Sequence, residues 1–548
     1  MISGDLLRDM YISAANNIEN HKASVNDLNV FPVPDGDTGT NMGMTFRCAA
    51  NDVKKLDGKS AGEVASAAAS ALLRGARGNS GVIISLIFRG FAKGLLGKET
   101  ADGADIAGAL KMGVEAAYKA VMKPTEGTIL TVARVAGEEA VTYAGETSDA
   151  LLMFDKIIEV AKDTLSKTPD MLPVLKAAGV IDAGGQGLVY ILEGMKSVLD
   201  NGVIIETQES AAVSDRADFA SFNGEDINFA YCTEYIVNKV YNPRFHEPQK
   251  LRSYLESIGD SVVVADDDGI IKVHVHTNNP GKALEEGLKY GFLSNMKVEN
   301  MKEQLAREAQ KEESQKETDD GVRRIAQPDK KYGFVAVSAG EGFTDLFHDL
   351  GVDGVANGFQ TMNPSTEDIL KEIDKTPAEV VYVLPNNKNI ILTAQMAAPL
   401  SEKEVIVIPT TTIPEGIAAL LAFDETADVN DNTNNMQAAI KNVKTGEITY
   451  AVRDSSFDGQ EIKQGQYMGL SGKKMHAIGM DLTKVTDELV AAMLDNNSSI
   501  LTLFSGKEVE SEKAQELADY MTKKYGDRVD VSLVEGGQPV YYYIVSVE

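Results

Sequence analysis

The chain has few of the residues that mark secreted, membrane-spanning or nucleic-acid-binding proteins. Among its 548 residues are only two cysteines, Cys48 and Cys232, too few for a disulfide framework and suited to a reducing compartment. Basic residues are also scarce, because 53 Lys and Arg stand against 82 Asp and Glu, and the net charge of -29 disfavours nucleic-acid binding. No apolar run approaches the roughly 18 residues that span a bilayer. We therefore expect a cytoplasmic protein without direct membrane insertion.

The length and the residue patterns predict a multidomain protein. Residues 1–202 show apolar residues at three- and four-residue spacing, which indicates an all-α domain. Residues 203–225 are polar and aperiodic, and we interpret them as a linker. The clearest helices are expected at 60–71, 105–122, 128–143 and 151–165.

Two further domains are predicted beyond the linker. Residues 226–300 combine β-rich runs with one helix at 249–258, which is typical of a small α+β domain. Residues 301–331 are highly charged and predict a solvated helix followed by a second linker. Over 332–548, short apolar strands alternate with helical stretches, which indicates a βαβ sheet in an α/β domain.

The segment NVFPVPDGDTGTNM, residues 29–42, concentrates carboxylates, glycines and hydroxyls. Asp35 and Asp37 flank Gly36, so a tight turn lets both carboxylates converge, and paired hard oxygen ligands suit Mg²⁺. Backbone and side-chain donors follow at an expected helix start, in Thr38, Gly39, Thr40 and Asn41. An Asx-rich turn with helix caps accounts for the same residues without any ligand.

Three more glycine-containing segments lie in the same domain. Residues 75–81 precede an apolar helix, so their amides could hold an anion. Glu126, Gly127 and Thr128 also open a helix, and 182–185 are expected to form a flexible loop before a helix at 188–199. Each segment alone is more often a structural turn.

Two histidines in the middle domain form half of a possible metal site. His274 and His276 are two residues apart on an expected strand, so both rings lie on one face. Cys232, on another expected strand, could supply a third ligand to Zn²⁺ with an open fourth position. Ordinary half-buried strand histidines are the alternative interpretation.

Two loops of the last domain are rich in polar residues. Residues 358–367 enter a helix with Ser365 or Thr366 as the N-cap, and 384–389 follow a strand. Loops at strand ends of an α/β sheet commonly hold ligands, although capping alone explains these residues.

Several motifs of the chain occur together in one known family. They are NVFPVPDGDTGTNM, RGARGNSGVI, MKPTEGTILTVA, GGQGL, YCTE, KVHVHT, FQTMNPSTEDI, LPNNKNI and GGQPVY. The helical segments resemble the nucleotide-binding domain of the dihydroxyacetone kinase L-subunit family, and the full chain resembles the ATP-binding subunit of bacterial fatty acid kinase. The resemblance implies an N-terminal helical barrel and a C-terminal DegV-like domain.

The resemblance also implies an activity and a set of site residues. The activity is transfer of the ATP γ-phosphate to a fatty acid carboxylate, with Asp35 and Asp37 holding Mg²⁺. The nucleotide-site residues it implies are Asn29, Thr38, Gly39, Thr40, Asn41, Gly78, Asn79, Ser80, Gly127, Thr128, Asp182 and Gly184. The dihydroxyacetone kinase pattern has a third aspartate where this chain has Val30, and the adjacent Asn29 is the candidate replacement.

The family has a cysteine and two histidines at the positions of Cys232, His274 and His276, which supports zinc. An open zinc position could polarise the acceptor carboxylate, so we expect the histidines at or near the active site, whereas a closed zinc site would brace the domain. The expected partner is a DegV-type carrier that presents the fatty acid for phospholipid synthesis, and a homodimer is expected. Two other functions stay open: a non-catalytic nucleotide-sensing scaffold, and a kinase for a small polyol such as dihydroxyacetone.

Overall fold

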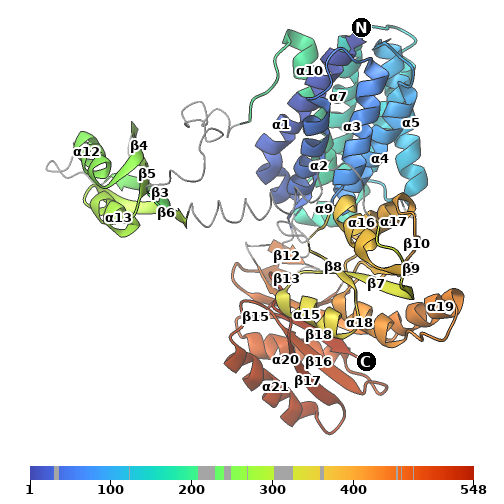
Figure 1. The fold of residues 1–548 in the computed structure, drawn as a ribbon, viewed down its shortest axis with the longest axis vertical. Coiled ribbons are helices and arrows are strands. Elements are labelled where there is room, and N and C mark those ends of the chain that lie inside the picture. Colours follow the sequence, from blue (N-terminus) through green and yellow to red (C-terminus); the bar gives the residue numbers. More distant parts are fainter. Residues whose placement is uncertain are drawn as a thin grey trace. The chain divides into compact units, whose positions relative to one another are not determined.

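The chain forms two units (Figure 1). The computed structural model describes residues 1–29, 36–121, 124–207, 229–239, 248–267, 270–300, 325–357, 363–451, 455–457, 460–472 and 474–548. The first unit contains 1–212 and 325–548, and the second contains 213–324. The expected linker beyond 207, the charged segment 301–324, Val30 and Asp35 lie outside the described residues.

The N-terminal part of the first unit is helical, as the sequence predicts. Its helices are α1 (Gly4–Leu28), α2 (Thr38–Val53), α3 (Ala61–Gly75), α4 (Gly78–Gly94), α5 (Gly103–Ala120), α6 (Ile129–Tyr143), α7 (Ala150–Ser166), α8 (Thr168–Met171), α9 (Pro173–Ala178) and α10 (Ala183–Asn201). The short strands β1 (Ile2–Ser3) and β2 (Thr100–Ala101) pair antiparallel. Small residues bring α4 and α5 together, since a Cβ on Gly90 would lie 2.5 Å from the Cα of Gly113.

Two of the three glycine-containing segments of this domain largely form helix first turns, while 126–128 form a turn that precedes α6. The expected loops at 75–81 and 182–185 largely belong to α4 and α10, which begin at Gly78 and Ala183. Glycine is a weak helix former, which favours a loop from sequence. Packing reverses that preference in α10, where a Cβ on Gly187 would lie 2.5 Å from the Met42 sulfur.

The C-terminal part begins with the expected βαβ arrangement. A parallel sheet has the strand order β10-β9-β7-β8, formed by β7 (Lys330–Ser338), β8 (Gly354–Asn357), β9 (Ala378–Leu384) and β10 (Glu404–Val407). Apolar clusters pack on both faces of this sheet. The connecting helices are α15 (Glu341–Asp349), α16 (Thr366–Lys375), α17 (Ile391–Ala397) with η2 (Ala398–Leu400), α18 (Ile413–Leu421) and α19 (Val429–Ile440).

The rest of this part forms a second sheet that departs from the βαβ prediction. Its order is β15-β14-β11-β18-β16-β17, and among these pairs only β16 and β17 are parallel. A short chain segment joins β14 to β15, with Gly472 at φ +61°, so these neighbours must run antiparallel. The elements are β11 (Lys444–Tyr450), β14 (Tyr467–Ser471), β15 (Lys474–Gly479), α20 (Leu482–Met493), β16 (Ile500–Ser505), α21 (Ser511–Tyr525), β17 (Asp530–Glu535) and β18 (Tyr543–Val547), with a separate hairpin of β12 (Ser455–Phe457) and β13 (Gln460–Ile462).

The helical and α/β parts of the first unit meet through α3, α4, α16 and α17 (Figure 1). Arg77 makes several of the contacts. Its Nη1 donates to the carbonyl of Asn363 at 3.0 Å, and its Nη2 lies 3.1 Å from a carboxylate oxygen of Asp368. Thr366 N–H also donates to the carbonyl of Ala76 at 3.2 Å. Ser365 is the N-cap of α16, as one of the two sequence alternatives predicts.

The second unit is a small α+β fold, as the sequence predicts. Its antiparallel sheet has the order β4-β5-β3-β6. Tyr235, Val273 and Val275 pack into one core with Leu251 and Leu255 of α12. The elements are β3 (Tyr231–Lys239), α12 (Pro248–Ile258), β4 (Gly259–Asp267), β5 (Ile270–Thr277), α13 (Pro280–Leu288) and β6 (Gly291–Asn300).

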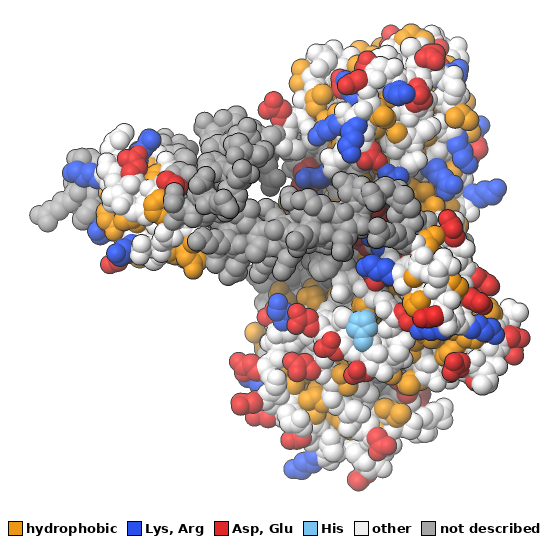
Figure 2. Space-filling model, viewed as in Figure 1, with side chains coloured by type: hydrophobic (Ala, Val, Ile, Leu, Met, Phe, Trp, Pro, Cys, Tyr) orange, Lys and Arg blue, Asp and Glu red, His pale blue; other side chains and the backbone are white. Residues whose placement is uncertain are grey.

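The excess of acidic over basic residues is visible at the surface. Figure 2 shows acidic side chains over much of the C-terminal part on the face in view, in line with the net charge of -29. In the described part of the chain, no helix is both long enough and apolar enough to cross a membrane.

Candidate nucleotide pocket

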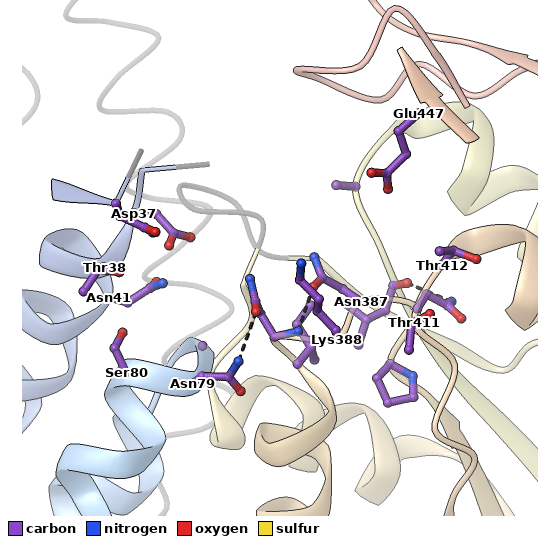
Figure 3. Close-up of a pocket in the computed structure, with 18 of the residues that line it drawn as sticks. Asp37, Thr38, Asn41, Asn79, Ser80, Asn387, Lys388, Thr411, Thr412 and Glu447 are labelled. Carbon is purple, nitrogen blue, oxygen red and sulfur yellow. Dashed lines mark hydrogen bonds between the residues drawn. The ribbon is translucent and has the colours of Figure 1, made fainter. Parts of the chain in front are cut away.

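One large pocket lies within the first unit, between its helical and α/β parts (Figure 3). Its volume is about 520 Å³, which is within the range of small-molecule sites. The helical part contributes Leu28, Asn29, Asp37, Thr38, Asn41, Gly78, Asn79, Ser80, Ile83, Thr128, Ile129, Leu175, Asp182, Ala183 and Gly184. The α/β part contributes residues from the ends of β7 and β9, from the segment before α18, and from the second sheet.

The first turns of four helices reach this pocket. Asp37 and Thr38 begin α2, Gly78 begins α4, Thr128 precedes α6, and Asp182 precedes α10. The N-cap residues of α2, α4 and α6 make no side-chain cap bond, although Oδ1 of Asn26 accepts from the Thr40 N–H in the first turn of α2 at 3.1 Å. First-turn amides have no partner within their own helix, and the helix dipole places partial positive charge there. The pocket wall is therefore suited to an anion such as phosphate.

Gly78 keeps the N-terminus of α4 open. Its φ of +56° is in the left-handed region, and a Cβ there would lie 2.8 Å from Nδ2 of Asn41. A side chain at this position would meet both backbone strain and a steric contact. Only glycine leaves the space between α2 and α4 free.

Asp37 and Asn41 lie one helical turn apart at the start of α2, and their side-chain oxygens are potential metal ligands at the same side of the pocket. The Asn41 N–H donates to the Asp37 carbonyl at 2.8 Å. Asn41 is only 3% exposed, and its Oδ1 has no hydrogen-bond partner among the described residues. A buried amide oxygen without a partner is costly unless a ligand or water satisfies it. Asp37 Oδ2 accepts from Nδ2 of Asn363, in the α/β part, at 2.5 Å.

Asp182 contributes a carboxylate whose pKa is higher than that of an ordinary aspartate. Burial raises the pKa of this group to about 6, although Oδ2 accepts a hydrogen bond from the Gly185 N–H at 2.7 Å. The same bond caps α10. Asp182 is therefore a carboxylate at the pocket wall whose charge changes just below neutral pH.

The α/β part closes the pocket with a tight turn after β9. Asn386 is buried with φ +54°, and its Nδ2 donates to the carbonyl of Val337 at 3.0 Å. Oδ1 of Asn387 accepts from the Asn389 N–H at 2.8 Å. Oδ1 of Asn389 accepts from Nδ2 of Asn79 at 3.0 Å, which joins the turn to α4. Figure 3 shows Asn387 and Lys388 between the α4 terminus and Thr411.

The structure brings together most of the sequence-predicted nucleotide residues, but not all of them. Asn29, Asp37, Thr38, Asn41, Gly78, Asn79, Ser80, Thr128, Asp182 and Gly184 line the pocket. Gly39, Thr40 and Gly127 are not among the lining residues. Thr40 instead accepts from Nδ2 of Asn26 at 2.9 Å, and a Cβ on Gly39 would overlap the backbone of Lys22. Asp35 lies outside the described residues.

Sequence reasoning missed the side chains that the second sheet and the segment before α18 add to the pocket. They include Thr411, Thr412, Thr445, Glu447 and Gln538. They come from separate segments, so no single local motif joins them, although Gln538 lies in the quoted motif GGQPVY. The turn at 384–389 was the exception, because it follows a strand and is rich in polar residues.

The middle-domain histidines lie in the second unit. His274 Nε2 and His276 Nε2 are 3.2 Å apart, and His276 Nδ1 lies 3.6 Å from a carboxylate oxygen of Asp260. The β3–β5 register places Cys232 directly opposite His276. No cluster of three or more His, Cys, Asp or Glu suited to a metal occurs among the described side chains, which do not include that of Cys232.

Three family models match the chain. They are a DAK2 domain at 32–197, the FakA-like middle domain of fatty acid kinase at 228–308, and the FakA-like C-terminal domain of fatty acid kinase at 333–548. Solved structures with some likeness include a fatty-acid-binding DegV family protein from Thermus thermophilus, with 14% identity and TM-score 0.31 over 40% of this chain and 99% of that one. The dihydroxyacetone kinase of C. freundii has 14% identity and TM-score 0.28 over 40% of this chain and 48% of that one.

Full-length relatives occur in staphylococci. A protein of Staphylococcus epidermidis is 41% identical over 556 residues, and one of Staphylococcus haemolyticus is 41% identical over 552. A protein of Staphylococcus aureus is 40% identical over 555 residues. Each match covers 100% of this chain and 99% of the relative. The chain carries a kinase-family domain and belongs to the FakA-like family of fatty acid kinase proteins.

Proposed function

We propose that the protein is the ATP-binding catalytic subunit of a fatty acid kinase. It transfers the γ-phosphate of ATP to the carboxylate of a fatty acid held by a DegV-type carrier, giving an acyl phosphate. The observation that carries this proposal is the pocket, where the N-termini of α2, α4, α6 and α10 meet beside Asp37 and Asn41. Membership of the FakA-like family supports the same activity.

The helix first turns would bind the phosphates of ATP. Amides at the starts of α2 and α4 point a partial positive charge toward the pocket, and no side chain at Gly78 blocks their approach. Ser80 and Thr38 add hydroxyl donors to the same wall. This arrangement stabilises the developing charge by fixed dipoles rather than by a covalent intermediate.

The oxygen donors in the pocket fit Mg²⁺. This ion prefers oxygen ligands and binds through one or two carboxylates together with substrate phosphates. Asp37 and the unpartnered Oδ1 of Asn41 would hold the ion, together with Asp35 as the family resemblance implies. When bound, Mg²⁺ supplies charge neutralisation to the phosphate oxygens.

The acceptor needs no general base. A fatty acid carboxylate is already ionised near neutral pH, so one of its oxygens can form the new bond to the γ-phosphorus directly. The bond from that phosphorus to the β–γ bridging oxygen breaks, and ADP leaves with the electron pair. The chain's own residues then act by holding the phosphates and excluding water.

The decisive experiment measures acyl phosphate formation from ATP, Mg²⁺, oleate and a purified DegV-type carrier from the same source. The intact chain is compared with Asp35→Ala, Asp37→Ala and the surface control Lys523→Ala, whose side chain is exposed on α21. Carrier-dependent product that disappears only in the aspartate variants supports the proposal. ATP binding without turnover in any combination contradicts it and favours the nucleotide-sensing scaffold.

The DAK2 match favours a second candidate, a kinase for a small polyol such as dihydroxyacetone. The same assay separates the two functions when dihydroxyacetone replaces oleate and the carrier is omitted. Phosphorylation of the polyol at a rate comparable to that of the carrier-bound acid would favour this second candidate.

We also propose a separate carrier protein and a homodimer. The family description names a subunit of fatty acid kinase, which supports a separate component, and we propose that this component is a DegV-type carrier. Light scattering after gel filtration, with and without the carrier, tests both. A mass of one chain alone under both conditions would contradict them.

For the middle domain we propose Zn²⁺ held by Cys232, His274 and His276, in contact with or close to the substrate. The two Nε2 atoms fit a common ion, because nitrogens bound at about 2.05 Å to a tetrahedral zinc lie about 3.3 Å apart, close to the observed 3.2 Å. Asp260 lies near the other ring nitrogen of His276, as carboxylates commonly do beside histidine ligands.

A further inference from the structure

The charges that line the pocket are unevenly distributed. Its acidic residues are Asp37, Asp182 and Glu447, and among the described lining residues Lys388 is the only lysine or arginine. The described residues of the helical part therefore offer helix amides and oxygen ligands to this pocket but no cationic side chain. A nucleotide triphosphate carries several negative charges, which kinases usually meet with a lysine or arginine as well as metal and amides. Among the lining residues that the structure describes, the one such side chain comes from the α/β part.

Lys388 is free to meet an anion. Its side chain is exposed, and it pairs with no carboxylate among the described residues. Lysine acts as a point charge on a flexible stem, so it can reach a phosphate without a fixed bidentate geometry. Among the described residues, the three acids of the pocket wall form no ion pair with it. Its charge is therefore available to a ligand.

The backbone that carries Lys388 is held firmly. Asn386 is fixed at φ +54° by its bond to the Val337 carbonyl, and Thr410 Oγ1 donates to Asn386 Oδ1 at 2.8 Å. Packing from α18 adds to this, because a Cβ on Gly416 would overlap the Asn386 side chain. A buried, non-glycine residue in the left-handed region persists only where its surroundings hold it there. The turn is thus a rigid base for one flexible cation.

The same turn is joined to the helical part beside the proposed phosphate site. Asn389, the residue after Lys388, accepts the hydrogen bond from Asn79 in the first turn of α4. Figure 3 shows Lys388 between Asn79 on one side and Thr411 on the other. Lys388 therefore lines the pocket next to a residue that contacts the first turn of α4.

We propose that Lys388 is a phosphate-binding residue that the α/β part contributes to the nucleotide pocket. The inference rests on the proposed function, because it takes ATP as the ligand. Under this proposal, the C-terminal domain contributes a residue directly to the phosphoryl-transfer site. A nucleotide then binds both parts of the first unit at once.

The test measures binding of Mg·ATP and of adenosine to the full-length protein by titration calorimetry or competition. The variants are Lys388→Ala, Lys388→Arg, Asp37→Ala and the control Lys523→Ala. Loss of one charge-assisted contact predicts that Lys388→Ala weakens Mg·ATP binding by about 10- to 100-fold. Adenosine binding should stay unchanged, Lys388→Arg should recover most of the affinity, and Lys523→Ala should match the unaltered chain.

The outcomes separate this inference from the proposed function. If Asp37→Ala loses Mg·ATP affinity while Lys388→Ala keeps it, the inference is wrong and the proposed function stands. Equal weakening of Mg·ATP and adenosine by Lys388→Ala also overturns the inference, since that pattern reports a structural role. If the unaltered chain binds no ATP, the proposed function itself fails.

Discussion

Asn79, in the first turn of α4, donates a hydrogen bond from Nδ2 to Oδ1 of Asn389, at 3.0 Å and across 310 positions of sequence. This bond joins the helix that would hold phosphate to the turn that presents Lys388. Together with the contacts of Arg77 to Asn363 and Asp368, this bond connects the helical and α/β parts that form the pocket. Changes in the α/β part should therefore be felt at the nucleotide site.

A double-mutant cycle at Asn79 and Asn389 should detect this coupling. A half-buried hydrogen bond between neutral amides contributes about 1 kcal/mol, so Asn79→Ala and Asn389→Ala should each destabilise the first unit. The double variant should be less destabilised than the sum of the two by a similar amount. Thermal unfolding measures all four proteins. A coupling energy near zero would show that the two side chains do not bond in solution.

Replacing Gly78 by alanine should lower both the stability of the protein and its affinity for Mg·ATP. The effect should exceed the cost of a left-handed backbone at an alanine. A left-handed alanine costs about 1 kcal/mol, and the contact with Asn41 adds to this. Gly179 is the matched control, because its φ is +66° and a Cβ there would meet nothing within 4 Å. Gly179→Ala should lower the unfolding temperature only slightly. Gly78→Ala should lower it further and weaken Mg·ATP binding, and equal effects would contradict the role of Gly78.

How much of this site the sequence predicted depends on whether the residues are neighbours along the chain. Asp37, Asn41 and Ser80 were predicted because each lies in a short segment where polar residues and glycines precede an apolar helix. Lys388 lies in a turn that the sequence marks only as a strand end. The opposite wall could not be predicted, because residues such as Thr411 and Glu447 come together only when two sheets and a helical domain pack.

In the fold, too, local elements could be predicted from the sequence, whereas contacts between distant segments could not. Helices with regular apolar spacing were predicted close to their observed bounds, such as 128–143 for α6 (Ile129–Tyr143). The sequence predicts a loop at the first turn of α10 because glycine has low helix propensity. The structure instead packs these glycines closely, since a Cβ on Gly185 would lie 3.0 Å from Leu165 and Val132, and one on Gly187 would lie 2.5 Å from Met42. The pairing order of the second sheet was not predicted, because strands β11 and β18 pair although about a hundred residues of sequence separate them.

Asp182→Asn should change how stability depends on pH. Burial raises the pKa of Asp182 to about 6 from 3.8, so the folded state holds the proton more tightly than the unfolded state. The resulting stabilisation is complete below about pH 4 and is lost as the pH rises through 6. Asparagine keeps the cap on Gly185 but carries no charge. Above pH 6 the variant should be more stable than the unaltered chain, by on the order of 2 kcal/mol, and the difference should vanish near pH 4.

Thermal unfolding of the ligand-free protein from pH 4 to 7 tests this expectation. The matched control is Asp149→Asn, an exposed N-cap of α7 that accepts from the Leu152 N–H at 2.9 Å. Asp149→Asn makes the same substitution at an exposed N-cap, so its pH profile gives the baseline against which Asp182→Asn is compared. A pH-independent difference for Asp182→Asn would contradict a raised pKa at that carboxylate.

Removing a middle-domain histidine should remove a bound zinc. With Nε2 atoms 3.2 Å apart, His274 and His276 are placed to share one ion, so either His274→Ala or His276→Ala should reduce the zinc content of the purified chain from about one per chain to near zero. His476, exposed on β15, is the control, and His476→Ala should retain the metal. Because metal affinity contributes directly to the stability of a small domain, chelation should also lower the unfolding temperature of the second unit. Activity measurements then show what the ion does. If zinc is lost while acyl phosphate formation continues, the ion stabilises the domain. If both zinc and activity are lost while the affinity for Mg·ATP is unchanged, the zinc site acts on the acceptor. Equal zinc content in all variants would contradict a zinc site at these histidines.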